Sequence, residues 1–233
     1  VSNNVNYNIT IGRNSIDQPT FPRQGSNFLL TLKLSPPYSM FDDIDDYTSL
    51  TDQEKYKWVE YYKWKFKATW FSPFTEKLIL ATKTEFGFLG AYNQELGISP
   101  FERFYVGGDG LSGMGYMNDG RELVALRGYS NNSLSPQTGA TIYNKYTAEI
   151  RYALSLNPTS TMYALAFLEA GNAWEEFDNF NPFGVKRSVG IGVKIMLPMI
   201  GMMGLDYGWG LDEVIGNPEA NGGQFHFSIG QNF

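Results

Sequence analysis

The sequence contains no cysteine and only one histidine among its 233 residues. The lack of cysteine excludes disulfide bonds and thiolate chemistry, and it agrees only weakly with an oxidising compartment. Charged residues make up 18% of the chain and the net charge is −6, which argues against a nucleic-acid partner. No apolar run approaches the about 18 residues that a membrane-spanning helix needs. The chain therefore crosses a membrane as strands or does not cross one.

Aromatic residues and glycine are abundant, at 16% of the chain and 25 residues. The mean hydropathy is nevertheless −0.29, a value typical of a water-soluble protein. A transmembrane β-barrel reconciles these facts, because every second residue of each strand faces an aqueous lumen. A soluble sheet with one wet face is the alternative at this stage.

Nine segments alternate apolar and polar residues with a period of two, as strands with one apolar face do. They are residues 5–12, 27–34, 62–70, 78–88, 145–154, 161–174, 187–197, 202–211 and 224–233. Parity predicts which side chains face lipid: Trp64, Phe66, Ala68, Ile150, Tyr152, Val193, Ile195 and Phe227. Lumenal side chains are predicted at Lys65, Glu149, Arg151 and Gly192. The expected fold is all-β, an antiparallel transmembrane barrel.

The connections between these strands alternate between short and long, as in porin-like barrels. Counted from a periplasmic C-terminus, residues 14–25, 72–76, 157–159 and 198–200 are periplasmic turns. Residues 35–55, 92–142, 175–186 and 212–223 are then extracellular loops. Nine is an odd number, and an open sheet edge cannot face lipid. We therefore expect residues 1–233 to be the C-terminal portion of one larger barrel domain, with more strands upstream.

Three segments together resemble a known family. The 92–142 loop contains Phe104-Tyr105-Val106-Gly107-Gly108 and then Leu126-Arg127-Gly128-Tyr129. A later strand contains Phe167, Glu169 and Gly171. The chain ends in Phe225-His226-Phe227-Ser228-Ile229-Gly230-Gln231-Asn232-Phe233. These resemble the VRG[FY] loop tip, the F-x-[DE]-x-G strand and the closing strand of the BamA-type outer-membrane assembly-factor superfamily. The resemblance covers residues 19–233 and implies strands 8–16 of a 16-stranded barrel. Leu126 in place of valine and a long insert at residues 109–124 depart from the pattern.

The resemblance implies a function in the bacterial outer membrane. It implies the central barrel of an assembly machinery that inserts client outer-membrane proteins, with lipoprotein partners, upstream POTRA domains, and no enzyme activity, cofactor or metal. Clients would enter at a lateral seam beside the last strand, whose seam and C-terminal signal residues are Phe225, Phe227, Ile229, Gly230 and Phe233. A related secretion or translocation barrel and a passive porin-like channel are the alternatives.

The loop motif and the strand motif carry opposite charges. Glu169 has the lumenal parity of its strand, so Arg127 on a loop folded into the lumen would form a charge-assisted fork with it. Gly128 would permit the close turn, and Tyr129 would pack beside the ion pair. A solvated loop arginine and an unrelated lumenal glutamate are the alternative.

Three other features have simpler interpretations. His226 has lumenal parity and is expected to be an ordinary polar lumen residue. The acidic loop 42–46 (Asp42, Asp43, Asp45 and Asp46) lacks the glycine and glutamate of a calcium loop, so a solvated loop is expected rather than an ion site. Lys63, Lys65 and Lys67 are expected to be solvated lumenal lysines rather than a substrate filter.

Overall fold

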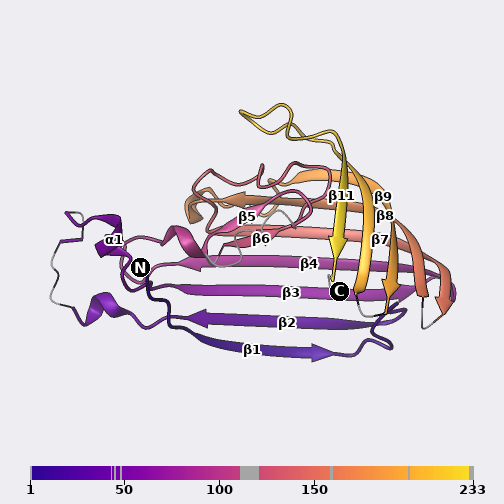
Figure 1. The fold of residues 1–233 in the computed structure, drawn as a ribbon, viewed down its shortest axis with the longest axis horizontal. Helices are drawn as coiled ribbons and strands as arrows, with labels where there is room; N and C mark the ends of the chain where they lie inside the picture. The colour runs from indigo at the N-terminus through magenta and orange to yellow at the C-terminus, as the bar shows by residue number, and fades with distance from the viewer. Residues whose placement is uncertain are drawn as a thin grey trace.

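A computed structural model describes residues 2–42, 44, 46–47, 49–110, 121–157, 160–198 and 200–230. Nine of its strands form one antiparallel sheet, here called the wall, in which each strand pairs with the next one in the chain order of these nine (Figure 1). These strands are β1 (Tyr7–Asn14), β2 (Gly25–Leu34), β3 (Tyr62–Pro73), β4 (Leu78–Gly90), β7 (Ile142–Asn157), β8 (Ser160–Trp174), β9 (Lys186–Leu197), β10 (Gly201–Gly210) and β11 (Gly223–Ile229). The nine predicted strands are thus confirmed.

The remaining elements are short and lie in the connections. Two three-residue strands, β5 (Phe104–Val106) and β6 (Glu122–Val124), form a separate parallel pair that the sequence did not reveal. The helical turns are η1 (Tyr38–Met40), α1 (Asp52–Lys55), η2 (Pro100–Glu102) and η3 (Phe177–Asn179). Among the described residues, no helix has the length and apolar character needed to cross a membrane.

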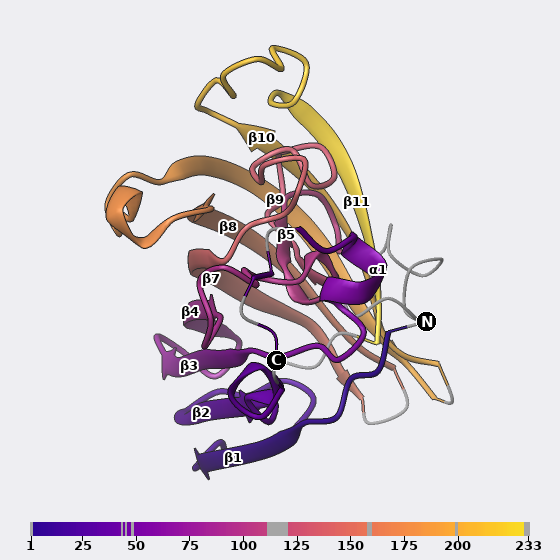
Figure 2. The same ribbon diagram turned by 90° about the vertical axis from the view of Figure 1, so that its left-hand side faces the viewer.

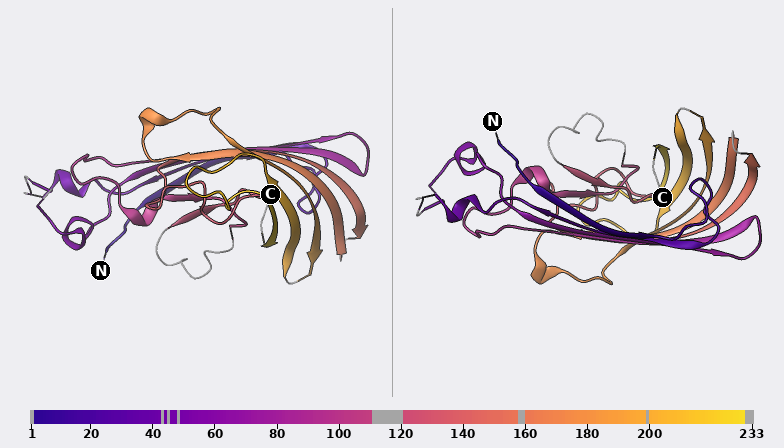
Figure 3. Two further views of the ribbon diagram at one scale, coloured as in Figure 1. Left: turned by 90° about the horizontal axis from the view of Figure 1, so that it is seen from above. Right: turned by 90° about the horizontal axis from the view of Figure 1, so that it is seen from below.

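The sheet is an open, curved wall. Within the described ranges β1 pairs with β2 alone and β11 pairs with β10 alone, so both outer strands are free edges and the wall is a partial barrel. Seen end-on, the strands follow an arc, and the connection that contains β5 lies on its concave side (Figure 2). Views from above and below show the strong curl of β8 to β11 (Figure 3). The concave side is therefore the lumenal side of this wall.

Burial on the wall is inverted relative to a soluble sheet. Large apolar side chains are exposed on the convex face, whereas Glu149, Arg151 and Glu169 are buried on the concave face. The predicted lipid-facing residues are exposed at Trp64, Phe66, Ile150, Tyr152, Val193 and Phe227, and Ile195 is half-buried. An exposed apolar band with a polar interior is typical of membrane barrels.

Ala68 is the exception among the predicted lipid-facing residues, because it is 0% exposed. It lies opposite Phe28 in the β2–β3 register. The rings of Phe28 and Trp70 pack edge-to-face with their centroids 4.7 Å apart. Ala68 shares the parity of Trp64, Phe66 and Trp70, but the prediction that it is exposed to lipid is wrong, and the larger side chains of Phe28 and Trp70 are its neighbours.

Cysteine substitution on the convex face tests its membrane exposure, and the native chain offers no competing thiol. With Ile150→Cys or Val193→Cys in membranes, we expect little or no reaction with a membrane-impermeant maleimide, because both positions would lie in hydrocarbon. Ile215→Cys is the control, since Ile215 is 98% exposed in the loop before β11. Labelling at residues 150 and 193 as fast as at residue 215 would contradict a lipid-facing convex surface.

Candidate functional site

The connection between β4 and β7 folds into the concave side and forms its own hydrogen-bonded unit. Phe104 of β5 exchanges two backbone hydrogen bonds with Ala140, each 2.8 Å long. The Leu126 N–H donates to the carbonyl oxygen of Gly108 at 3.1 Å. These bonds give the loop a defined path, so the segment 126–129, here called the loop tip, reaches the wall in a fixed orientation.

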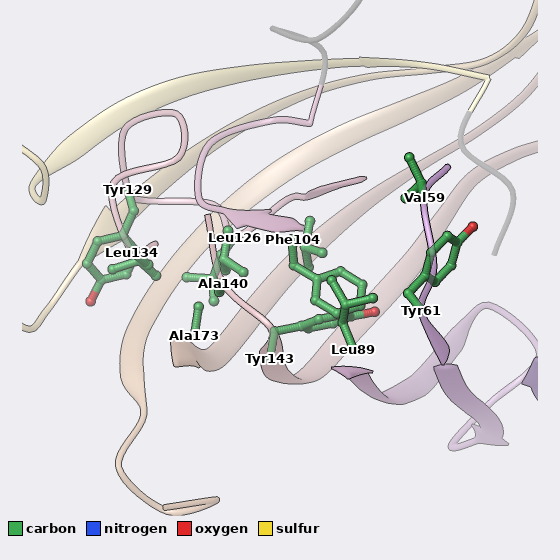
Figure 4. Packing of buried hydrophobic residues seen from close by; sticks show 12 residues of the cluster. Val59, Tyr61, Leu89, Phe104, Leu126, Tyr129, Leu134, Ala140, Tyr143 and Ala173 are labelled. Atoms are coloured by element: carbon green, nitrogen blue, oxygen red, sulfur yellow. The ribbon is translucent and has the colours of Figure 1, made fainter. Parts of the chain in front are cut away.

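An apolar cluster holds this loop against the wall (Figure 4). Leu126 and Phe104 are fully buried there, and the Phe104 ring lies 4.7 Å from that of Tyr143 on β7. An added Cβ at Gly171 of β8 would lie 2.6 Å from the backbone oxygen of Asn144 and 2.7 Å from a Leu126 methyl group, so glycine permits both close contacts. Burial of one large apolar side chain stabilises by about 1.5–3 kcal/mol. Leu126 and Gly171 therefore form a packing pair between the two motifs.

Arg127 lies at the centre of the site, where the structure brings it together with Glu169. Its Nη2 is 2.8 Å from Glu169 Oε1, and its backbone N–H donates to Glu169 Oε2 at 2.8 Å. The guanidinium also binds Glu149 at 2.7 Å and Asp206 at 3.3 Å. Its carbon Cζ lies 3.6 Å from the centre of the Phe167 ring, a cation–π contact. One loop arginine thus joins β7, β8 and β10.

The three carboxylates do not depend on Arg127 alone. Each also binds a cation from the wall, and these pairs are Lys145–Glu169 at 3.0 Å, Arg151–Glu149 at 2.6 Å and Lys194–Asp206 at 2.7 Å. The predicted contact between Arg127 and Glu169 is thus present, and the sequence did not reveal the other members of this charge cluster. Burial alone would lower the pKa of Arg127, but the three carboxylates raise it above its ordinary value. The arginine stays charged, and the wall keeps paired charges without it.

Gly128 brings the loop backbone into contact with the backbone of β10. Its φ is +87°, and an added Cβ would come within 2.7 Å of the Gly210 nitrogen and the Trp209 carbonyl carbon. From the opposite side, a Cβ at Gly208 would lie 2.6 Å from the Gly128 nitrogen. Glycines on both sides are therefore needed for this approach, which accounts for the glycine-rich inner face of β10.

Tyr129 and the strand ends fix the far side of the loop tip. Tyr129 is fully buried in the apolar cluster, and its hydroxyl donates to the Arg187 carbonyl oxygen at 2.7 Å. The backbone N–H of Asp212 donates to the same hydroxyl at 3.2 Å. Tyr129 thus ties the tip to the start of β9 and to the connection after β10.

The loop has a second attachment to the wall, in which the loop supplies the carboxylates and the strands supply the lysines. Glu102 of η2 is buried and binds Lys63 of β3 at 2.8 Å and Lys33 of β2 at 3.3 Å. Glu122 of β6 binds Lys65 at 2.8 Å and Lys63 at 3.5 Å. The expectation of solvated lysines was wrong for Lys63, which is buried, whereas the Lys65 side chain is paired but remains 37% exposed. The loop thus offers a cation to the acidic wall and two carboxylates to the basic wall.

The Glu102 attachment carries its own pH dependence. Burial raises the pKa of Glu102, but the nearby Lys63 and Lys33 lower it to a net value below the ordinary 4.5. A carboxyl group with a depressed pKa in the folded state stabilises above its ordinary pKa, and its contribution is lost as the pH falls through the lowered value. The attachment is therefore complete at neutral pH and weakens only below pH 4.5.

Glu102→Gln tests this second attachment at neutral pH. We expect faster hydrogen exchange in residues 98–106, with a local loss of about 2 kcal/mol, because Lys63 and Lys33 lose a charged hydrogen-bond partner. Glu95→Gln is the matched control, because Glu95 is an exposed carboxylate of the same loop. Equal exchange in the two variants would show that Glu102 does not anchor the loop.

The last strand presents the predicted apolar face outward. Phe225 and Phe227 are 73% and 40% exposed on the convex side of β11, and Ile229 is also exposed. Gly230 has a φ of +66°, so the backbone turns where the strand ends. Phe233 lies outside the described residues.

The acidic loop 42–46 is described only in part. Asp42 accepts a hydrogen bond from the Tyr47 hydroxyl, and Asp43 and Asp45 lie outside the described residues. Among the described residues, no group of three or more His, Asp or Glu side chains has an arrangement that could hold a metal ion.

Comparisons with known proteins agree with this architecture. The model of the Omp85 superfamily domain matches residues 1–233. A search of curated proteins found no match. Among solved structures, the chain resembles BamA from Haemophilus ducreyi lacking POTRA domains 1–3, with a TM-score of 0.62 and 19% identity over 94% of this chain and 41% of that one. The chain thus spans less than half the length of this structural neighbour.

Proposed function

Because this chain belongs to the Omp85 superfamily, we propose that it forms the C-terminal part of an outer-membrane barrel that folds and inserts other β-barrel proteins. The observation that carries the proposal is the loop tip, which Arg127 fastens to carboxylates on three strands of the wall. A loop fastened in this way braces β7 to β10 as one unit. A passive channel has no evident need for such a brace next to its last strand.

The outer edge of β11, where the last strand would meet the first strand of the whole barrel, is the proposed insertion seam. Among the described residues β11 is seven residues long, whereas β7 has 16 residues and β8 has 15. The pairing of β11 with β10 is therefore shorter than the pairing between β7 and β8. Its outer edge offers N–H and C=O groups to a client strand, which is β-augmentation. The outward residues Phe225 and Phe227 would keep an apolar surface toward lipid while the client strand pairs.

Client folding by this route needs no covalent chemistry. Each client strand gains backbone hydrogen bonds that lipid cannot supply, and its apolar face leaves water. We therefore assign no catalytic residue and no cofactor to the chain. Client outer-membrane proteins, assembly lipoproteins and upstream POTRA domains are part of the proposal, because the family resemblance implies them.

Site-specific cross-linking tests the seam in the full-length protein. Phe227→Cys is combined with a client barrel that carries cysteines along one strand and is stalled during insertion. Ile150→Cys on β7 is the matched control, because it lies on the same face with a similar exposure, 48% against 40%. We expect disulfides to the client at residue 227 and few at residue 150. Equal cross-linking at both positions, or none at residue 227, would contradict insertion at β11.

A further inference from the structure

The only histidine of the chain bonds the loop tip to the last strand. The backbone N–H of Gly128 donates to His226 Nε2 at 2.8 Å, and the His226 side chain is buried. His226 stands opposite Asp206 in the β10–β11 register. Sequence parity places this imidazole in the lumen but does not reveal the bond, because the donor is a backbone group 98 residues away. Among the described residues, this is the one side-chain hydrogen bond that joins the loop tip to β11.

The direction of this hydrogen bond determines the protonation state that it needs. Nε2 accepts, so the imidazole is neutral and its proton is on Nδ1. A protonated imidazole carries N–H groups on both nitrogens and would present a donor to the donor of Gly128. The ring also borders a polar cavity of about 120 Å³ beneath the loop tip, which gives protons a route to it.

Charged groups from every neighbouring element face this cavity. The carboxylates are Asp109 of the loop, Glu149 of β7, Glu169 of β8 and Asp206 of β10. The cations are Arg127 of the loop, Lys83 of β4, Lys145 and Arg151 of β7, and Lys194 of β9. The four carboxylates favour a charged imidazole, whereas the five cations oppose it. Glu169, Lys194 and Asp206 have ion-pair partners of their own, so none of these three requires a charge on His226 to be satisfied.

We propose that His226 is a pH-sensitive positioning residue that couples the loop tip to the last strand. With the imidazole neutral, the tip holds β11 and the β7–β10 wall together. Protonation breaks the bond to β11 alone, while Arg127 continues to hold the tip on β7, β8 and β10. The last strand is then retained by its pairing with β10, by the hydrogen bond from Lys194 of β9 to Ser228 at 3.0 Å, and by the connection that precedes it. This goes beyond the proposed function, because it concerns the coupling and not the clients.

Hydrogen exchange at Gly128 in the full-length protein in lipid vesicles measures this coupling. We compare about pH 7.5 with about pH 5.5, on either side of the ordinary histidine pKa of about 6.5, after correction for intrinsic exchange rates. In the unmodified protein we expect the Gly128 amide to exchange about tenfold faster at the lower pH, the cost of one buried hydrogen bond. The exchange of Arg127, whose amide donates to Glu169, is expected to stay constant and is the internal control.

Two variants separate a coupling role from a merely structural one. His226→Gln places a neutral amide oxygen near the position of Nε2, so we expect Gly128 to stay protected at both pH values. His226→Leu removes the acceptor, so we expect rapid exchange at both. The proposal is overturned if Gly128 exchange in the unmodified protein does not change with pH, or if the His226→Gln variant shows the same change. Because no client takes part, this result is independent of the insertion test.

Discussion

Arg127→Glu is expected to release the loop tip from the wall and to abolish client insertion, while the strands themselves still assemble. The substitution places a fourth carboxylate against Glu169, Glu149 and Asp206, which already form one buried cluster. Arg127→Ala should be milder, at about 3 kcal/mol, because each of these carboxylates keeps a wall cation. The measurements are the client insertion rate in vesicles and the protease sensitivity of the loop.

The control for Arg127 is Arg23→Glu. Arg23 is an exposed arginine that pairs with Asp17 in the turn between β1 and β2, so its loss should leave insertion unchanged. A double-mutant cycle of Arg127→Ala with Glu169→Gln then isolates one contact of the cluster. We expect a measurable but partial coupling, since Glu149 and Asp206 still bind Arg127. Strictly additive effects would mean that the loop does not bind the wall through Glu169.

Gly128→Ala is expected to lower client insertion nearly as much as the loss of Arg127. The new Cβ would meet backbone atoms of Trp209 and Gly210 at 2.7 Å, and backbone of a paired strand cannot move aside as a flexible side chain can. The tip must therefore lift away from β10, which also lengthens the Arg127 contacts. The measurements are the insertion rate and hydrogen exchange across residues 125–131.

Gly216→Ala is a closely matched control for Gly128→Ala. Gly216 has a φ of +81°, close to the +87° of Gly128, but nothing lies within 4 Å of an added Cβ. Its substitution incurs only the left-handed backbone strain of about 1–2 kcal/mol, in an exposed loop. Near-normal insertion in this variant together with a strong defect at Gly128 identifies the close approach as the cause. Equal insertion defects in the two variants would mean that backbone strain alone causes the effect of Gly128→Ala.

The faces of the strands could be predicted from the sequence because the signal is local. Side chains alternate with a period of two, so residues 62–70 reveal both faces of β3 without knowledge of their neighbours. The family motifs also directed attention to Arg127 and Glu169 before their contact was known. Ala68 shows the limit of predictions from parity. Its burial depends on its larger neighbours Phe28 and Trp70, and Phe28 belongs to an adjacent strand.

The sequence by itself therefore determined the nine strands of the wall, their two faces and the residues of the loop motif. Only the tertiary structure decided which groups those residues meet. Arg127 reaches carboxylates 22, 42 and 79 residues away, and Gly128 reaches His226 across 98 residues. The attachment of Glu102 to Lys63 is likewise a long-range contact. The physical reason is that these partners meet only when the loop folds onto a curved wall. The local periodicity of the sequence does not predict how the loop folds.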